Sequence, residues 1–201
     1  MESQKPSHKK ALKAYVERFV KLSPEAFEDF YTHCEWQSLE KKQFLFEAGQ
    51  VCKHQYFVLE GLFRSFYVDE KGNEQILHFA IENWWCTDYE SYVTDSPSTL
   101  SLQALEASSV LCIGKTELEH LFDQHPGIER LFRLIAEKTF IAAQNRLKFL
   151  LSMKREDIHE EFVEVTDGFT QRVPQYMVAS YLGFTPEFLS MIRARKRKKE
   201  Q

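Results

Sequence analysis

The last residues of the chain hold a dense run of positive charge. Six basic side chains stand within seven positions, and they are Arg193, Arg195, Lys196, Arg197, Lys198 and Lys199. Guanidinium and ammonium groups at this density are suited to neutralising phosphates, so the run could bind a nucleic-acid backbone. A charge run of this kind can equally be a solvated tail without a partner. The residues that precede the basic run favour one of these two interpretations.

The rest of the chain is acidic. The 201 residues include 26 lysines and arginines against 30 aspartates and glutamates, a net charge of −4. Removing the six basic residues of the run and Glu200 leaves 20 basic and 29 acidic residues, a net charge of −9. Because an acidic body repels nucleic acid, any contact with nucleic acid should be confined to the basic end.

The residues before the basic run fit two short helices joined by a tight turn. Gly183 can adopt the positive φ that a sharp turn requires, and the small Ala179 lets a second helix approach closely. Thr185 offers an N-cap hydroxyl and Pro186 suits the first helical position, so a new helix should begin there. The pattern predicts a helix-turn-helix, with a generic helical hairpin as the alternative. Its small shared core would consist of Val178, Leu182, Phe184, Leu189 and Ile192.

The second helix of this pair would make the contacts to DNA. Once Phe188, Leu189 and Ile192 are assigned to the core, the exposed face holds Pro186, Glu187, Ser190, Met191 and Ala194. Glu187 could accept a hydrogen bond from a cytosine amino group, or it could serve only the positive helix end. Ser190 could bond to a base or to a phosphate. The predicted DNA-binding residues are Thr185, Glu187, Ser190, Met191, Arg193, Arg195, Lys196 and Arg197.

Helical and then strand-like segments precede this end of the chain. Apolar residues recur at helical spacing over 12–31, and Ser23-Pro24-Glu25 restarts a second helix. Thr116-Glu117-Leu118-Glu119 is typical of a capping box that opens a short helix. Between them, short aromatic and β-branched runs separated by turn residues predict an antiparallel roll or barrel at about 40–115. Its strands are expected at 56–59, 62–68, 75–79, 100–105 and 110–113.

A long helix is expected from about Ile128 to Met153, after Pro126-Gly127 interrupts the chain. Apolar residues repeat along it at steps of four and seven, which favours a coiled coil with the same helix of a second subunit. The stripe could instead pack on the roll of its own chain, and the polar Lys138 and Asn145 interrupt it. The expected dimer interface is Leu131, Ile135, Ala142 and Phe149.

These segments predict an α+β fold of N-terminal helices, an antiparallel roll, a long dimerisation helix and a C-terminal helix-turn-helix domain. The expected domains are a sensor domain at 1–126, the connecting helix at 127–153 and the helix-turn-helix domain at 154–201. No apolar run approaches the roughly 18 residues needed to span a bilayer. The four cysteines form no CxxC pair and follow no secretory leader, so reduced thiols and a cytoplasmic location are expected.

This order of parts, with the run Tyr56-Phe57-Val58-Leu59-Glu60-Gly61 in the roll, resembles the Crp/Fnr superfamily of bacterial transcription regulators. The resemblance extends from about Phe44 to Ala194, and the last twenty residues look most like Bacteroidota-type members. It implies a cyclic-nucleotide-binding-like roll, a homodimer formed by the long helix, and a roughly palindromic site in double-stranded DNA. RNA polymerase would be a further partner. Family members often present arginine where Met191 stands, and usually add a β-wing that the basic tail here could replace.

The cyclic-nucleotide site of that family pairs an acidic residue with an Arg-Ser pair about ten residues later. The resemblance places Asp88 at the acidic position, but Ser98 and Thr99 where Arg-Ser is expected. A cyclic phosphate would lack its bidentate partner, so cyclic AMP is not the expected effector. Arg64 could supply another cation, although its strand would more often turn it to solvent, and Trp85 could line a pocket or belong to the core. The candidate pocket is Arg64, Trp85, Asp88, Ser98 and Thr99, with no cofactor expected and any small-molecule effector unidentified.

Two other functions fit parts of the sequence. An enzyme built on the roll, as in cupin-like metal oxygenases, would need clustered histidine and carboxylate ligands, commonly a His-x-His pair, and the sequence has none. An iron–sulfur centre would need a cysteine cluster near the N-terminus, where only Cys34 stands. A sensor or adaptor would bind a small molecule in the roll and dock a protein, not DNA, through its helical end. The favoured interpretation is a DNA-binding regulator and not an enzyme.

Overall fold

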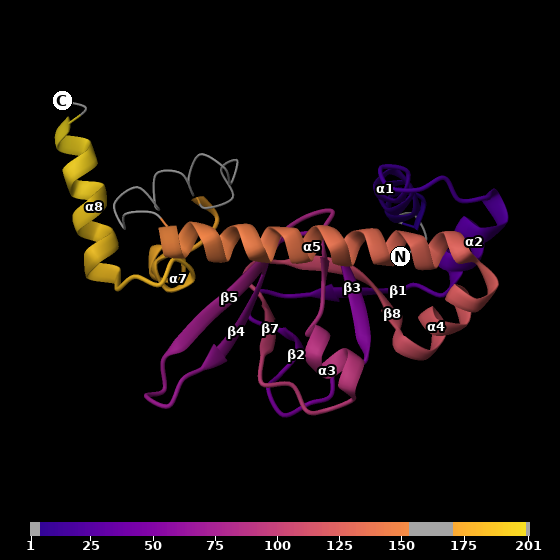
Figure 1. The fold of residues 1–201 in the computed structure, drawn as a ribbon, viewed down its shortest axis with the longest axis horizontal. Coiled ribbons are helices and arrows are strands. Elements are labelled where there is room, and N and C mark those ends of the chain that lie inside the picture. The colour runs from indigo at the N-terminus through magenta and orange to yellow at the C-terminus, as the bar shows by residue number, and fades with distance from the viewer. Residues whose placement is uncertain (1–4, 153–170, 200–201) are drawn as a thin grey trace. The chain divides into compact units, whose positions relative to one another are not determined.

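The computed structural model of the chain describes residues 5–152 and 171–199, and its elements are labelled in Figure 1. Two compact units make up the chain. One contains residues 1–65 and 79–139, and the other contains residues 66–78 and 140–201. The domain boundaries expected at 126 and 153 stay predictions. The boundary expected at 153 lies at the edge of residues 153–170, which are outside the described ranges.

Two helices open the first unit, α1 (Lys5–Val16) and α2 (Pro24–Thr32). Ser23 caps α2, because its Oγ accepts a hydrogen bond from the backbone N–H of Ala26 at 3.1 Å, and Pro24 occupies the first helical position. The predicted restart of the helix is therefore confirmed. Both helices turn apolar side chains inward, and Leu12 and Phe30 are completely buried.

Two four-stranded sheets form the roll that the sequence predicts, and all five expected strands are present. The first sheet has the strand order β1-β8-β3-β6 and the second β2-β7-β4-β5. A short helix, α3 (Tyr89–Thr94), follows β6 and was not expected. The strands are β1 (Glu35–Leu39), β2 (Phe44–Phe46), β3 (His54–Glu60), β4 (Phe63–Val68), β5 (Glu74–Ala80), β6 (Trp85–Cys86), β7 (Ser101–Ala104) and β8 (Ser108–Gly114).

The strand β3 separates two apolar clusters. Its residue Phe57 points into a cluster shared with α1, α2, α4 and the start of α5, whereas Tyr56 and Val58 point into the interior of the roll. Alternate side chains of a strand face opposite sides, so a strand covered on both sides has to be apolar throughout its middle. This requirement explains the run Tyr56-Phe57-Val58 in the sequence.

The helix α4 (Lys115–Gln124) begins two residues earlier than the capping-box pattern predicts. Its N-cap is Gly114, which makes no side-chain cap hydrogen bond, so Thr116 is already the second helical residue. The reason is that β8 continues to Gly114, which pairs with His54, and the N–H of Lys115 donates to the carbonyl of Lys53 at 2.9 Å. The chain passes directly from strand to helix, and the capping box is wrong although the helix exists.

The long helix α5 (Pro126–Ser152) has different surroundings along its length. Leu131 is fully buried in the cluster of its own roll, and Ile135 packs against the same cluster. Leu131 therefore has no surface left for a second subunit, which corrects the interface expected from the seven-residue stripe. Of the other two expected residues, Ala142 is exposed and the side chain of Phe149 is not among those described.

An apolar stripe lies on the opposite side of α5. Phe140, Leu147 and Leu151 are exposed to 64%, 58% and 78%, and at 3.6 residues per turn they fall on one face. Their spacing of seven and four residues is the spacing that a paired helix requires. The same helix thus has two apolar stripes, one of which covers the roll near its beginning and one of which is uncovered near its end.

Candidate DNA-binding surface and effector site

The turn between α7 (Gln175–Tyr181) and α8 (Pro186–Lys199) is closed by its backbone. The N–H of Gly183 donates to the carbonyl of Ser180 at 3.0 Å, and the N–H of Phe184 donates to that of Ala179 at 2.8 Å. This pair of bonds is the Schellman motif, which places its glycine in the left-handed region, and Gly183 has φ +71°. The predicted sharp turn at Gly183 is confirmed.

The start of α8 follows the predicted cap. The Oγ1 of Thr185 accepts a hydrogen bond from the N–H of Phe188 at 3.2 Å, and Pro186 is the first helical residue. The ring of Phe188 meets the ring of Phe184 edge-on at 5.2 Å. All five expected core residues of the helix pair are buried, and they are Val178, Leu182, Phe184, Leu189 and Ile192.

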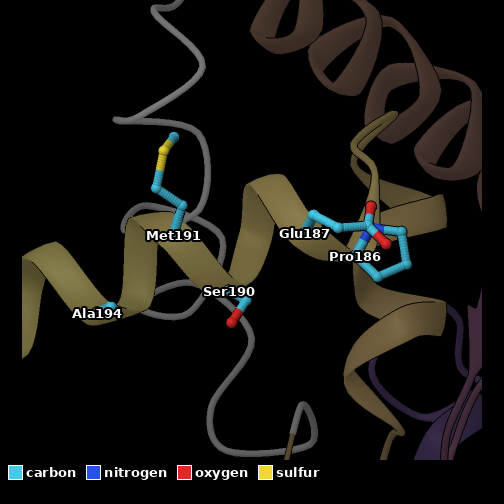
Figure 2. Close-up of a pocket in the computed structure, with 5 residues that line it drawn as sticks. All are labelled: Pro186, Glu187, Ser190, Met191 and Ala194. Atoms are coloured by element: carbon cyan, nitrogen blue, oxygen red, sulfur yellow. The ribbon is translucent and has the colours of Figure 1, made fainter.

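The outer face of α8 forms a shallow concavity (Figure 2). Because Leu189 and Ile192 are buried at 1% and 5% exposure, the helix cannot rotate about its axis without losing that core. The opposite face is therefore held outward, and Met191 is 38% exposed. Of the predicted DNA-binding residues, Thr185, Glu187, Ser190 and Met191 are all exposed. The residues that line the concavity are Pro186, Glu187, Ser190, Met191 and Ala194.

The basic run belongs to the same helix. The backbone is helical to Lys199, so Arg193, Arg195, Lys196 and Arg197 continue α8 beyond its exposed face. Their side chains are not among those described, and their contact with DNA stays a prediction. Cations in the last turns of a helix also complement its dipole, which gives the run a favourable local position apart from any partner.

The hairpin of β4 and β5 is attached to α7 and α5 within the second unit. Arg146 of α5 donates to the carbonyl of Leu77 at 2.7 Å and to that of Tyr181 at 2.8 Å, and its guanidinium carbon lies 3.9 Å from the centroid of the Tyr181 ring. Ser180 of α7 accepts from the N–H of Ile76 at 2.9 Å and donates to the carbonyl of Glu74 at 3.2 Å. We call these contacts of Arg146 and Ser180 the hairpin clasp.

The sequence does not predict the hairpin clasp, because its hydrogen bonds join residues that are 35 to 106 positions apart. Nothing in the residues near Arg146 distinguishes it from the other cations of the helix. His78 lies next to Leu77 in the chain, and its imidazole does not add a charge to the clasp. Burial and the nearby Arg146 guanidinium lower the pKa of His78 to about 4, so the imidazole is neutral at ordinary pH. The positive charge of the clasp therefore comes from Arg146.

The acidic residue at the expected effector site, Asp88, is hydrogen-bonded to other groups of the same chain. Asp88 is buried, and its Oδ1 accepts from the N–H groups of Glu90 and Ser91 at 3.1 and 3.5 Å, which caps α3. Its Oδ2 accepts from the hydroxyl of Ser98 at 2.6 Å. The Oγ of Ser98 also accepts from the N–H of Leu100 at 2.9 Å. The structure thus brings Asp88 and Ser98 together as a closed hydrogen-bonded group.

The other candidate pocket residues lie in different surroundings. Arg64 is only 5% exposed and its Nε donates to the side-chain oxygen of Gln103 at 2.9 Å, so the expectation that its strand turns it to solvent is wrong. Thr99 is exposed. Trp85 lies in the aromatic core, where its ring is 5.3 Å from that of Phe57 and 5.0 Å from that of Phe132. Trp85 is therefore part of the core, and a pocket shared by the other four candidates stays a prediction.

Burial disfavours the thiolate form of three of the cysteines, Cys34, Cys86 and Cys112. Burial raises the pKa of Cys34 to about 12, and burial also raises the pKa values of Cys86 and Cys112. Over residues 5–152 and 171–199, no three His, Cys, Asp or Glu side chains are grouped in a way that could hold a metal ion. In the same described ranges, no helix combines the length and apolar character needed to cross a membrane.

Comparisons with known proteins agree with this arrangement. A family described as "Cyclic nucleotide-binding domain" matches residues 36–125. The "Fumarate and nitrate reduction regulatory protein" of Vibrio cholerae is 26% identical over 175 residues, which cover 81% of this chain and 68% of that protein. The "Transcriptional activator protein anr" of Pseudomonas aeruginosa is 29% identical over 174 residues, which cover 78% and 68%.

A solved structure has the same fold over most of the chain. FixK2 from Bradyrhizobium japonicum superposes with a TM-score of 0.71 at 15% identity, over 83% of this chain and 86% of its own. The family match covers the roll, whereas the relatives and the structure extend beyond it into the helical end. In its roll and in these relatives, the chain is similar to transcription regulators of the Crp/Fnr superfamily.

Proposed function

We propose that the protein is a homodimeric transcription regulator that binds a specific sequence in double-stranded DNA by placing α8 in the major groove. The observation that carries this proposal is the outer face of α8. It is held outward by a buried core on its other side and is followed in the same helix by six cations. Relatives named as regulators support the same function.

The two parts of α8 would have different tasks. Its first two turns, which hold Glu187, Ser190 and Met191, have the polar and apolar groups that can contact base edges. The basic run that begins at Arg193 would contact phosphates, which position the helix but do not read sequence. At 1.5 Å per residue the fourteen residues of α8 extend about 21 Å, so one helix can do both.

The second subunit would pack on the exposed stripe of α5. Phe140, Leu147 and Leu151 are large apolar side chains on one helix face, and pairing with a copy of themselves would remove them from water. A two-fold dimer would present two α8 helices to two half-sites of a palindrome, about one turn of DNA apart. The dimer interface is thus proposed on this stripe, in place of the one that includes Leu131.

Replacing both Arg193 and Arg195 by alanine is expected to weaken DNA binding and to reduce its dependence on salt. Each phosphate contact contributes about 0.9 to the slope of log affinity against log salt concentration, so two lost contacts in each chain, which are four in the dimer, should lower that slope by about 3.6. Fluorescence anisotropy between 50 and 200 mM salt, with a site selected from random DNA, would measure it.

A matched control for this change removes two cations elsewhere. Lys41 and Arg133 are exposed, and their double alanine variant has the same net charge as the first variant. It should retain the salt slope of the unmodified protein. Equal slopes for all three proteins, or DNA affinity that is indifferent to salt, would contradict the proposal. A protein that binds small molecules but no DNA at all would be a sensor or adaptor instead.

We propose further that the effector, if the roll binds one, is not cyclic AMP. The carboxylate of Asp88 is already satisfied by Ser98 and by the start of α3, and no arginine follows at the position where the family places one. A cyclic phosphate entering there would have to displace these bonds and approach the buried carboxylate of Asp88.

Cyclic AMP at 1 mM is accordingly expected to leave the melting temperature of the protein unchanged. A ligand that binds the native state at one hundred times its Kd stabilises it by about 2.7 kcal/mol, which a thermal melt detects as a shift of several degrees. Adenosine 5′-monophosphate serves as the control for nonspecific binding. A concentration-dependent shift with the cyclic nucleotide alone would show that the closed group at Asp88 opens.

A cytoplasmic location and a contact with RNA polymerase are parts of the same proposal. The absence of disulfide bonds among Cys34, Cys52, Cys86 and Cys112 supports a reducing compartment. A bacterial transcription regulator would meet both its DNA site and RNA polymerase in the cytoplasm.

A further inference from the structure

We propose that Met191 recognises the 5-methyl group of a thymine, so that one position in each DNA half-site is selected by an apolar contact. This inference rests on the proposed function, because it requires α8 in the major groove. It goes beyond that function by assigning a specificity-determining residue and the chemical group that it reads.

The position of Met191 is the first support. It is a large apolar side chain that is 38% exposed, while its neighbour Ile192 is only 5% exposed. Because Leu189 and Ile192 fix the rotation of α8, Met191 faces outward as a consequence of the fold. It lines the same concavity as Glu187 and Ser190, and Figure 2 shows Glu187 at the start of α8 and Ser190 and Met191 one turn later, pointing to different sides of the helix.

The chemistry of the side chain is the second support. A thioether donates no hydrogen bond and accepts only weakly, so methionine cannot form the two-bond contact by which arginine or lysine identifies guanine. Among the groups at base edges in the major groove, the thymine methyl is the one that an apolar side chain recognises. Ala194, one turn further along, extends the apolar surface to accommodate it.

The residues beside Met191 indicate which base-edge groups the other positions of α8 would contact. Glu187 can only accept hydrogen bonds when ionised, so it suits an amino group of cytosine or adenine, and Ser190 can both donate and accept. From its N-terminus onward, the exposed surface of α8 therefore presents first a hydrogen-bond acceptor, then a group that both donates and accepts, and then an apolar side chain. We infer that the half-site has an amino group facing the start of α8 and a thymine methyl about one turn later.

The test uses the full-length protein and a DNA site selected from random sequence. Each thymine of the site is replaced in turn by deoxyuridine, which keeps every hydrogen bond and lacks only the methyl group. At one thymine per half-site, the replacement should weaken binding by about four-fold, the value expected for exposing one buried methyl group. The other thymines should show no change.

Met191→Ala is expected to bind more weakly and to lose this sensitivity, so that its thymine and deoxyuridine sites have equal affinity. Met191→Leu, which keeps an apolar side chain, should retain it. Because Met191 is exposed, both variants should melt at the temperature of the unmodified protein. Replacing the critical thymine by cytosine should lose affinity, and 5-methylcytosine should recover part of it.

The possible failures are distinguishable. DNA binding in which no thymine responds to deoxyuridine, or in which Met191→Ala and the unmodified protein respond equally, would overturn this inference and leave the proposed function standing. A protein without affinity for any selected DNA would overturn the proposed function, and this inference with it.

Discussion

Leu147→Glu is expected to convert the dimer to a monomer and to lower the affinity for a palindromic DNA site at least one hundred-fold. Leu147 is 58% exposed, on the same face of α5 as Phe140 and Leu151. In a two-fold pair of helices the new carboxylate would be buried in an apolar seam near its own copy, without a cation to neutralise it. The DNA affinity falls because the second α8 is no longer delivered to the second half-site at a high effective concentration.

Sedimentation velocity at micromolar concentration would measure the oligomeric state, and anisotropy would measure the affinity. Ala142→Glu is a well-matched control, because it places the same charge on an exposed position on the opposite side of α5. It should leave the dimer intact. If Ala142→Glu dissociates the dimer and Leu147→Glu does not, the interface lies on the stripe that the sequence periodicity first indicated.

Arg146→Ala is expected to release the β4–β5 hairpin from α7, at a cost of about 3 kcal/mol in the stability of that contact. The guanidinium makes charge-assisted hydrogen bonds to the carbonyls of Leu77 and Tyr181 and lies over the Tyr181 ring. Hydrogen exchange reports this opening, because the N–H of Ile76 is held by Ser180 on the other side of the same contact. A loss of about 3 kcal/mol should speed that exchange by roughly 150-fold.

Arg133→Ala is the control for this variant. Arg133 also belongs to α5, but it pairs with Glu137 on the surface, where an ion pair contributes less than about 1 kcal/mol. Exchange at Ile76 should be unchanged in that protein. Arg146→Lys should fall between the two, because lysine keeps the charge without the planar fork that reaches two carbonyls at once. Full protection of Ile76 in Arg146→Ala would show that Ser180 alone holds the hairpin.

Local residues were sufficient to predict the helix-turn-helix. Its signals lie within a few residues of what they control: Gly183 supplies a positive φ, and Thr185 caps the helix that Pro186 starts. The five core positions follow from helical spacing on each side of that turn. Backbone conformation and capping depend on neighbours in the chain, so such elements can be predicted from local residues. The strands of the roll were predictable for the same reason, from runs such as 56–59.

The use of the two faces of α5 depends on the packing of distant segments and could not be predicted from local residues. Periodicity reports that a helix has an apolar stripe, but not whether that stripe meets its own roll or another subunit. Leu131 lies in the core of the roll, whereas Leu147 remains exposed. Likewise, the residues near Thr116 do not indicate that β8 continues to Gly114. Because it does, the helix starts before Thr116, which cannot serve as its N-cap.

Long-range hydrogen bonds were also beyond local prediction. Asp88 could have bound a ligand, and in the fold its carboxylate is occupied by Ser98, ten residues away. Arg64 could have faced solvent, and it is buried beside Gln103, 39 residues away. The partner of a charged side chain depends on which distant segments meet, because a buried polar group takes whatever donor or acceptor the packing brings within reach. The sequence determined which groups could react, and the packing of distant segments determined which of them stay available to a ligand or to DNA.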